Sequence, residues 1–141
     1  SLAGLRVGFG VARPAVIEML MKVKDSYNVN AASQAAGMAA LDDEAHVARN
    51  VAALVQTREW FARELAARGW ETVPSAANFV LAAPPAGEAA ALVAQLEQCG
   101  YLVRHFSTPR LRRFIRFSIG TDAQMRGLLA CLEQSLQASS S

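Results

Sequence analysis

The sequence predicts an α+β fold, a short sheet covered by helices on one face, with a strand and helices left from a larger α/β domain. Three observations predict it. Of the 141 residues, 52% are hydrophobic and 18% are charged, so the chain can build a core and is not disordered. Residues 43–141 read as helix–strand–helix–strand–strand–helix, a pattern that packs helices on a small sheet. The first apolar strand has no neighbouring strand to pair with, so we expect it to come from a larger fold.

The first 41 residues predict one strand and two helices. Residues 5–12 read as a short buried strand that stops at Arg13. The run from Ala31 to Leu41 consists mainly of small residues, so we expect this second helix to approach a neighbouring backbone closely. Pro14 fits the first position of the first helix, where its missing N–H costs nothing, and apolar residues then recur at helical spacing: Val16, Ile17, Leu20 and Met21.

The longest predicted helix begins at the acidic run Asp42-Asp43-Glu44 and ends at Gly69. Acidic side chains favour the positive end of a helix dipole, and glycine readily takes the conformation that ends a helix. Glu59–Arg63 and Glu64–Arg68 have the spacing of ion pairs on the exposed side of this helix. Its apolar stripe consists of Val47, Val51, Leu54, Val55, Phe61 and Leu65.

The rest of the chain predicts the small sheet and its helices. In the last strand Ile115 and Phe117 alternate with Arg116, so the arginine lies on the opposite face from the two apolar residues. Thr121 and Gln124 form a capping box that opens the final helix. The predicted strands are residues 78–82, 101–106 and 113–119, and a helix is predicted at residues 88–99.

Composition excludes several classes of function. A net charge of +2 gives no marked basic excess for binding nucleic acid or an acidic membrane. Arg or Glu interrupts every apolar run before it reaches membrane-spanning length, and the chain opens without the basic region of a secretory signal. Cys99 and Cys131 make no disulfide framework, so we expect two small core residues in a reducing cytosol. These features predict a soluble, intracellular, globular protein.

Three motifs with known chemistry are incomplete in this sequence. Gly8-Phe9-Gly10 lacks the third glycine of a dinucleotide-binding loop. His46, His105 and the two cysteines show no metal-ligand spacing. Ser118, His105 and Asp122 contain the residue types of a nucleophilic triad, but no nucleophile elbow accompanies them. We therefore expect no metal site and no serine nucleophile.

Arginines give the strongest chemical signal. Arg116 lies in mid-strand beside Phe114 and Ser118, and a partly buried arginine is costly unless an anion meets it. The planar guanidinium binds a carboxylate or phosphate through two parallel N–H bonds. The pattern therefore favours an arginine-lined pocket for a small anion. The alternative is a solvated basic face, which suits Arg110 and Arg112. The arginines concerned are Arg6 in the first strand and Arg104, Arg110, Arg112, Arg113 and Arg116 in one short stretch.

Five segments carry a family resemblance. They are residues 1–10 (SLAGLRVGFG), 24–30 (KDSYNVN), 75–80 (SAANFV), 100–104 (GYLVR) and 115–121 (IRFSIGT). In this order they resemble fold-type I pyridoxal-phosphate aminotransferases, with the greatest similarity to histidinol-phosphate aminotransferases. The resemblance covers essentially the whole chain as the C-terminal portion of that family. The first and last segments are fairly specific when they occur together.

The resemblance implies both a cofactor and substrates. Arg6 resembles the arginine that binds the phosphate of pyridoxal 5′-phosphate. Arg116 resembles the arginine that grips the substrate α-carboxylate, and Arg104 the one near the distal end of the substrate, where a phosphate would sit. The implied reaction moves an amino group between glutamate and a phosphorylated amino compound such as histidinol phosphate. The implied protein is a cytoplasmic homodimer of histidine biosynthesis that binds small molecules, with no nucleic-acid or membrane partner.

The resemblance also implies what this chain lacks. The lysine that forms the Schiff base with the cofactor is expected a few residues before Ser1, so we expect the chain by itself to be inactive, with no catalytic residue of its own. Residues 1–42 then correspond to a remnant of the large cofactor-binding domain and residues 43–141 to the small C-terminal domain. Two alternatives remain open: a free-standing α+β binding or dimerisation module with an arginine-lined anion pocket, and a phospho-amino-acid decarboxylase of the same fold.

Overall fold

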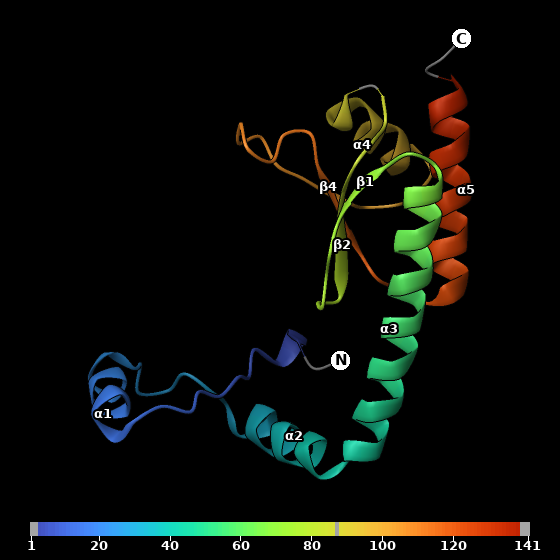
Figure 1. Cartoon of the computed structure of the whole chain (residues 1–141). Coiled ribbons are helices and arrows are strands. Elements are labelled where there is room, and N and C mark those ends of the chain that lie inside the picture. The colour runs from blue at the N-terminus through green and yellow to red at the C-terminus, as the bar shows by residue number, and fades with distance from the viewer. Residues whose placement is uncertain (1–2, 87, 139–141) are drawn as a thin grey trace. The chain divides into compact units, whose positions relative to one another are not determined.

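The computed structural model describes residues 3–86 and 88–138, which form two compact units (Figure 1). The first unit ends at Arg49 and the second begins at Asn50, so the boundary falls inside helix α3 (Glu44–Ala67). The sequence assigns residues 1–42 and 43–141 to two domains of a larger enzyme. This assignment is not the same as the division of the chain into compact units, and it stays a prediction. The α+β fold predicted for the chain is confirmed, because helices and a small antiparallel sheet make up the second unit.

The first unit contains a 3₁₀ turn (Ala3–Leu5), helix α1 (Pro14–Val23) and helix α2 (Ala31–Asp42). The predicted strand at residues 5–12 is wrong, because the chain is irregular from residue 7 to residue 13. A strand needs a partner for its backbone N–H and C=O groups, and within the described residues no strand pairs with this segment. Both predicted helices are confirmed.

Helix α2 begins with a side-chain cap and contains the expected close approach. Asn30 precedes the helix, and its Oδ1 accepts a hydrogen bond from the Ser33 backbone N–H at 2.8 Å. Gly37 faces Val7, since a Cβ placed at position 37 would lie 3.4 Å from Val7 Cγ1. The neighbour is thus a side chain, where the sequence predicts a backbone.

Helices α3 and α4 (Ala89–Gln98) end in the same backbone motif. Gly69 has φ +81°, and the N–H of Trp70 donates to the Leu65 carbonyl at 3.1 Å. Gly100 has φ +83°, and the next N–H donates to the Leu96 carbonyl at 2.9 Å. Positive φ is easy for glycine, and the bonds satisfy carbonyls that the helix leaves free. The predicted end of the long helix at Gly69 is therefore confirmed.

Four strands form one antiparallel sheet in the order β1-β2-β4-β3. Their bounds are Glu71–Val73, Phe79–Ala83, Ile115–Ser118 and Arg104–His105 for β1, β2, β4 and β3 respectively. The sequence predicts β2, β3 and β4 with bounds that differ by several residues, and it misses β1. Helix α5 (Asp122–Ala138) follows β4, and the Thr121–Gln124 capping box is confirmed by two backbone-to-side-chain bonds of 2.9 and 3.3 Å.

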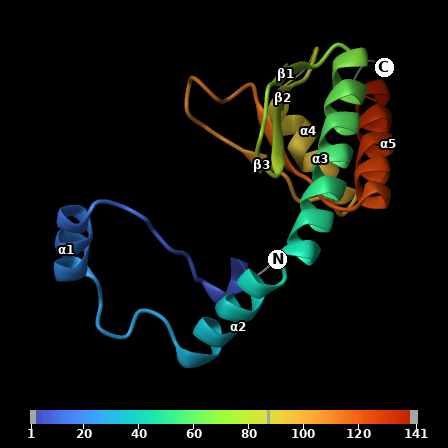
Figure 2. The ribbon, with the colours of Figure 1, turned by 60° about the horizontal axis from the view of Figure 1, so that its bottom comes forward.

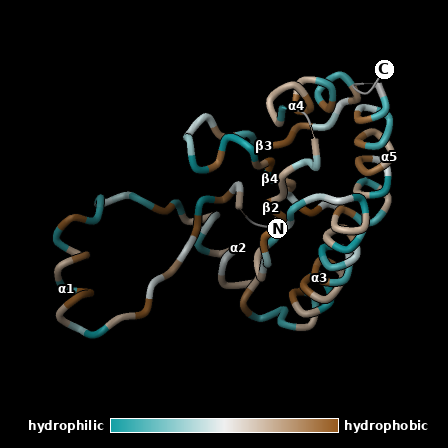
Figure 3. The backbone as a smooth tube through the Cα atoms, turned by 45° about the horizontal axis from the view of Figure 1, so that its top comes forward, coloured by the Kyte–Doolittle hydropathy of each residue, from teal (hydrophilic) through white to brown (hydrophobic). Residues whose placement is uncertain are grey.

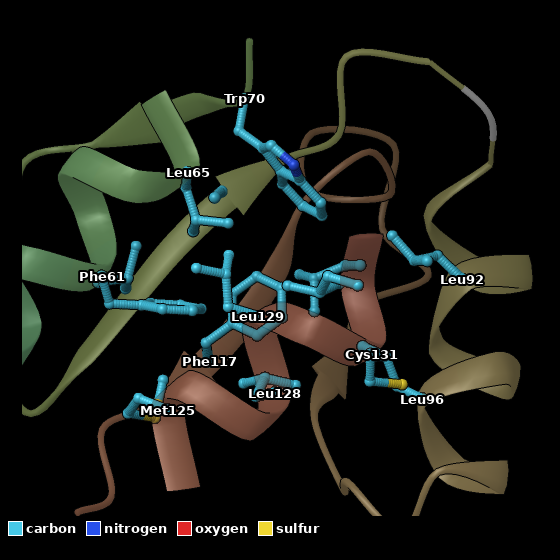
Figure 4. Packing of buried hydrophobic residues seen from close by; sticks show 14 of the residues in the cluster. Phe61, Leu65, Trp70, Leu92, Leu96, Phe117, Met125, Leu128, Leu129 and Cys131 are labelled. Carbon is cyan, nitrogen blue, oxygen red and sulfur yellow. The ribbon is translucent and has the colours of Figure 1, made fainter. Parts of the chain in front are cut away.

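The core of the second unit lies between one face of the sheet and its helices (Figure 4). Figures 1 and 2 show α3 and α5 on one side of the sheet, and Figure 3 shows hydrophobic and hydrophilic positions alternating along both helices. Phe117 packs edge-on against Phe61 and Trp70, with ring centroids 5.6 and 5.8 Å apart. Because Val80, Ala82, Ile115 and Phe117 are buried, the alternate residues of β2 and β4 lie on the opposite, open face.

The two cysteines are bonded to each other, whereas the sequence predicts two separate core residues. Cys99 and Cys131 form a disulfide that links the end of α4 to α5, with Cα atoms 6.7 Å apart. Cys131 is buried, as the sequence predicts, but Cys99 is exposed, although the sequence predicts a core residue there too. The pair is separated by 32 residues, so only the packing of α4 beside α5 brings the sulfurs together.

Candidate functional site

The open face of the sheet brings together two of the arginines that the sequence singles out. Arg104 on β3 and Arg116 on β4 are directly opposite each other in the antiparallel register. Residues in such a position lie on the same face, with Cβ atoms roughly 4.5–5.5 Å apart. Leu81 on β2 stands opposite Arg116 on its other side, so the three residues form a row across the sheet.

The charges of this pair are not neutralised by the protein. Two like charges directly opposite each other destabilise a sheet, and among residues 3–86 and 88–138 neither Arg104 nor Arg116 has an ion-pair partner. The neighbouring Arg113 does have one, since its Nη2 lies 2.6 Å from a Glu71 carboxylate oxygen. An anion placed between Arg104 and Arg116 would remove this repulsion.

Arg116 also has a buried donor that no protein atom satisfies. Its side chain is half-buried, and its Nε has no hydrogen-bond partner within the described structure. Leaving a buried donor unpaired costs roughly 1–3 kcal/mol, and more when the group is charged. The guanidinium carbon lies 5.4 Å from the centre of the Phe79 ring, while that of Arg104 lies 5.6 Å from the Phe106 ring.

A rigid turn before β2 fixes the aromatic side of the site. Ser75 Oγ donates to the Phe79 carbonyl at 2.7 Å and accepts from the Ala77 N–H at 3.1 Å. The Arg58 guanidinium, whose side chain is 11% exposed, reaches over from α3 and donates to the Ala77 carbonyl at 2.9 Å. The N–H of Ile119 donates to the Asn78 carbonyl at 2.9 Å, which ties the turn to the end of β4. This contact of the Asn78 backbone is structural.

The other arginines of the stretch belong to the loop between β3 and β4. Figure 3 shows this loop as hydrophilic over most of its length. Arg110 and Arg112 are exposed there, in agreement with a solvated basic face. His105 Nε2 and the Arg112 carbonyl lie 2.7 Å apart, a hydrogen bond that fastens the loop to β3. This contact gives His105 a structural role.

Arg6 lies in the first unit and has an unusual backbone conformation. Its φ is +56°, and in the described chain it is the only non-glycine residue with positive φ. Such a conformation costs roughly 1–3 kcal/mol and is concentrated at functional sites. Its side chain is exposed and has no ion-pair partner within the described residues.

Two further arginines, Arg68 and Arg126, form short hydrogen bonds with carboxylates of α3 and α5. Glu133 and then Glu64 raise the pKa of Arg68, and Asp122 raises the pKa of Arg126, through short hydrogen bonds. Asp122 accepts a hydrogen bond from Arg126 at 2.7 Å, whereas in a nucleophilic triad it would pair with a histidine. In the described part of the chain no group of three or more His, Cys, Asp and Glu side chains could hold a metal ion, and no helix is long and apolar enough to cross a membrane.

Comparison with known proteins shows the family of the chain. Residues 1–132 match the sequence pattern of the family described as aminotransferase class I and II. The chain belongs to this family. It is 44% identical to the histidinol-phosphate aminotransferase of Aromatoleum aromaticum and 46% identical to that of Geobacter sulfurreducens. The alignments cover 97% and 95% of this chain but 39% and 38% of those proteins, so the chain spans about two fifths of the length of these relatives.

Solved structures share the fold of this chain. The chain superposes with a TM-score of 0.86 and 28% identity on the Sinorhizobium meliloti histidinol-phosphate aminotransferase, solved in complex with pyridoxal-5′-phosphate, and covers 38% of it. It also superposes with a TM-score of 0.76 on the L-threonine-O-3-phosphate decarboxylase of Porphyromonas gingivalis, where 24% identity shows the fold alone.

Sequence reasoning finds both arginines of the pair but misses their supports. Alternation alone identifies Arg116, whereas the pairing with Arg104 depends on a strand register that the sequence does not reveal. Phe79, Ser75 and Arg58 are missed as parts of the site. The signal for Phe79 is its alternation with buried Val80, which places its ring on the same open face as the arginines.

Proposed function

We propose that this chain forms the substrate-binding C-terminal part of a pyridoxal-phosphate-dependent aminotransferase of histidine biosynthesis. The enzyme would move an amino group between glutamate and histidinol phosphate. The names of the relatives support this substrate class. The observation that carries the proposal is the arginine pair on the open sheet face, with its uncompensated charge and the orphaned Nε of Arg116.

The arginine pair suits both substrates because each carries an amine and an anionic group. The planar guanidinium of Arg116 can hold a carboxylate through two parallel N–H bonds, which fixes the amino acid in orientation as well as position. Arg104 stands opposite on β3 and would hold the phosphate of histidinol phosphate, a substrate that has no carboxylate, whereas Arg116 would hold the α-carboxylate of glutamate. Since the two side chains leave adjacent strands on the same face, an anion lying between them can take donors from both.

Arg6 fits the phosphate of the cofactor. Its left-handed backbone is closed by a 3.2 Å hydrogen bond from its N–H to the Ala3 carbonyl, and its exposed side chain has no ion-pair partner within the described residues. Pyridoxal phosphate, when bound, supplies the electron sink that the reaction needs. This chain would contribute to its binding through a charge-assisted contact, and to the reaction by orienting the substrate.

The proposal also includes the location and the assembly of the enzyme. We place the enzyme in the cytoplasm, where amino-acid biosynthesis has its substrates, and we expect a homodimer. Membership in an aminotransferase family supports an enzyme over a free-standing binding module. The decarboxylase alternative rests on the shared fold alone.

The proposal is tested on the complete enzyme to which we assign this chain. Purified enzyme with pyridoxal phosphate, histidinol phosphate and 2-oxoglutarate should form glutamate. Histidinol, which lacks the phosphate, should react with a kcat/KM lower by at least about a hundredfold, because several charge-assisted hydrogen bonds of roughly 1.5–3 kcal/mol each are lost. Release of carbon dioxide from a phosphorylated amino acid without glutamate formation would favour the decarboxylase. Equal rates with histidinol and its phosphate would contradict the assignment of the arginines.

A further inference from the structure

Arg104 and Arg116, which have no ion-pair partner within the described residues, each lie over an aromatic ring, and this arrangement can keep a guanidinium ordered without occupying its donors. A free guanidinium on a sheet face samples many orientations, and ordering it on binding costs affinity. A carboxylate partner would order it but would also neutralise it and occupy its N–H donors. A ring face attracts the cation through its quadrupole and leaves the donors and the charge available to a ligand.

The contact between Arg116 and Phe79 has these properties. The guanidinium carbon is 5.4 Å from the ring centre, and Nε is free of protein partners within the described residues. Phe79 stands opposite Ser118 in the register, so Arg116 reaches it diagonally across β2 and β4. Diagonal neighbours on one sheet face are within reach of aromatic and long side chains.

Phe79 is itself held in place without belonging to the core. In the described part of the chain, neither the buried cluster nor the partly buried hydrophobic residues packed against it include Phe79. Its backbone is instead fixed by Ser75 Oγ, and the turn before it by Arg58, through bonds of 2.7 and 2.9 Å. A half-buried ring outside the core, at the start of a strand that follows a hydrogen-bonded turn, is poorly explained by stability alone.

We infer that Phe79 is a positioning residue, whose ring face orients the guanidinium of Arg116 for the anionic group of the substrate. This inference rests on the proposed role of Arg116 as an anion-binding residue. Phe79 touches no reacting atom in this account and acts only through Arg116. Phe79 should therefore strengthen binding of the anion equally in the ground state and in the transition state.

The first test uses the 141-residue chain and inorganic phosphate as the probe, with binding followed by NMR. Phe79→Leu keeps an apolar side chain but removes the ring face, and should weaken phosphate binding roughly fivefold. Phe79→Tyr keeps the face and should bind as the parent chain does. Phe114→Leu is the matched control, because Phe114 lies 5.5 Å from the guanidinium carbon of Arg113, which is already paired with Glu71. This control should leave phosphate binding unchanged.

The variants also separate this inference from the proposed function. Arg116→Gln should abolish most phosphate binding, and adding Phe79→Leu to it should change nothing further. If Arg116→Gln binds phosphate normally, the proposed role of Arg116 fails. If Arg116→Gln weakens binding while Phe79→Leu does not, or if the two effects simply add, the positioning role of Phe79 is wrong.

Two further measurements guard against an effect of folding. The thermal midpoint of Phe79→Leu should stay close to that of the parent chain; a large drop accompanied by weaker binding would count against the inference. If Phe79→Leu does not fold, Phe79→Trp provides the test, since indole is the strongest cation-binding ring and should tighten phosphate binding. In the complete enzyme, Phe79→Leu should raise KM for 2-oxoglutarate, whose carboxylate Arg116 would hold, about fivefold with kcat changed by less than about twofold.

Discussion

Gly127 in α5 shows how one missing side chain makes room for another. A Cβ at this position would collide with the hydroxyl group of Tyr101, which comes directly after Gly100 at the end of α4. Glycine inside a helix costs about 1 kcal/mol relative to alanine, whereas overpacking costs roughly 1–3 kcal/mol. We therefore expect Gly127→Ala to lower the free energy of unfolding by about 1 kcal/mol, measured by urea denaturation.

The control for this prediction removes the obstacle. In a Tyr101→Phe background the colliding oxygen is gone, and the ring carbon that carried it would lie 3.5 Å from the new Cβ. Gly127→Ala should then stabilise the protein by about 0.5–1 kcal/mol, because only the helix preference remains. The same change in stability in both backgrounds would show that Tyr101 is not the cause.

A second prediction at the scale of single residues concerns Arg68. Its guanidinium lies 2.6 Å from Glu64 of α3, the helix that Arg68 directly follows, and 2.6 Å from Glu133 of α5. Glu133 and Glu64 raise the pKa of Arg68 in the folded state. The stabilisation that Arg68 provides to the folded state is therefore fully present at every pH below the ordinary pKa of arginine, and it stays constant through neutral pH. Because the side chain is about a third exposed, Arg68→Gln should cost only about 1 kcal/mol. Urea denaturation should give the same loss at about pH 6 and about pH 9 and a smaller one in molar salt; a loss unaffected by salt would contradict the ion-pair explanation.

At the scale of elements, the sequence predicts what local chemistry decides. The helix from Glu44 to Ala67 has a periodic stripe and a terminal glycine, and the last helix has a capping box, so both are predicted well. Strand β1 has three residues and depends on pairing with β2, which no local pattern reveals. The irregular segment 7–13 is the reverse case, because its apolar sequence favours a strand but the described residues provide no strand to pair with it.

The disulfide between α4 and α5 gives a prediction at the scale of elements. Cross-linking residues 32 positions apart reduces the entropy of the unfolded chain and stabilises the fold by about 3–4 kcal/mol. Cys99→Ser, at the exposed end of the pair, should therefore lose about this free energy of unfolding when denatured without reductant. With a thiol reductant present, the parent chain and Cys99→Ser should have the same stability. Two free thiols in the untreated native chain, with no difference between the variants, would contradict the link.

At the scale of the whole molecule, the buried hydrophobic residues are unevenly distributed. Those of the described chain all lie between Phe61 and Leu132, while Ser33 is the only buried residue described in the first unit. A segment without a core opens at little free-energy cost. Amide hydrogens of α1 and α2 should therefore exchange rapidly, whereas those of β2, β4 and α5 should exchange only through global unfolding. Hydrogen exchange measured residue by residue tests this, and equal protection in both units would contradict it.

The candidate site shows the same limit of sequence reasoning at the largest scale. Alternation identifies Arg116 because a charged residue interrupts an apolar strand, and this signal is local. The pairing of Arg104 with Arg116 and the placement of Phe79 beside them require the order β2-β4-β3, in which neighbours in space are not neighbours in sequence. Family resemblance supplies Arg6, whose strained backbone is visible only in three dimensions.

The most direct test of the account compares Arg116→Lys with Arg112→Lys in the complete enzyme. Lysine keeps the positive charge but has no planar fork, so at position 116 it should lower kcat/KM for amino transfer by about one to two powers of ten. Arg112 is exposed on the loop between β3 and β4, and the same change there should have almost no effect. Both variants should keep the stability of the parent protein. If Arg116→Lys proves as harmless as Arg112→Lys, Arg116 does not hold the substrate and the proposed site is wrong.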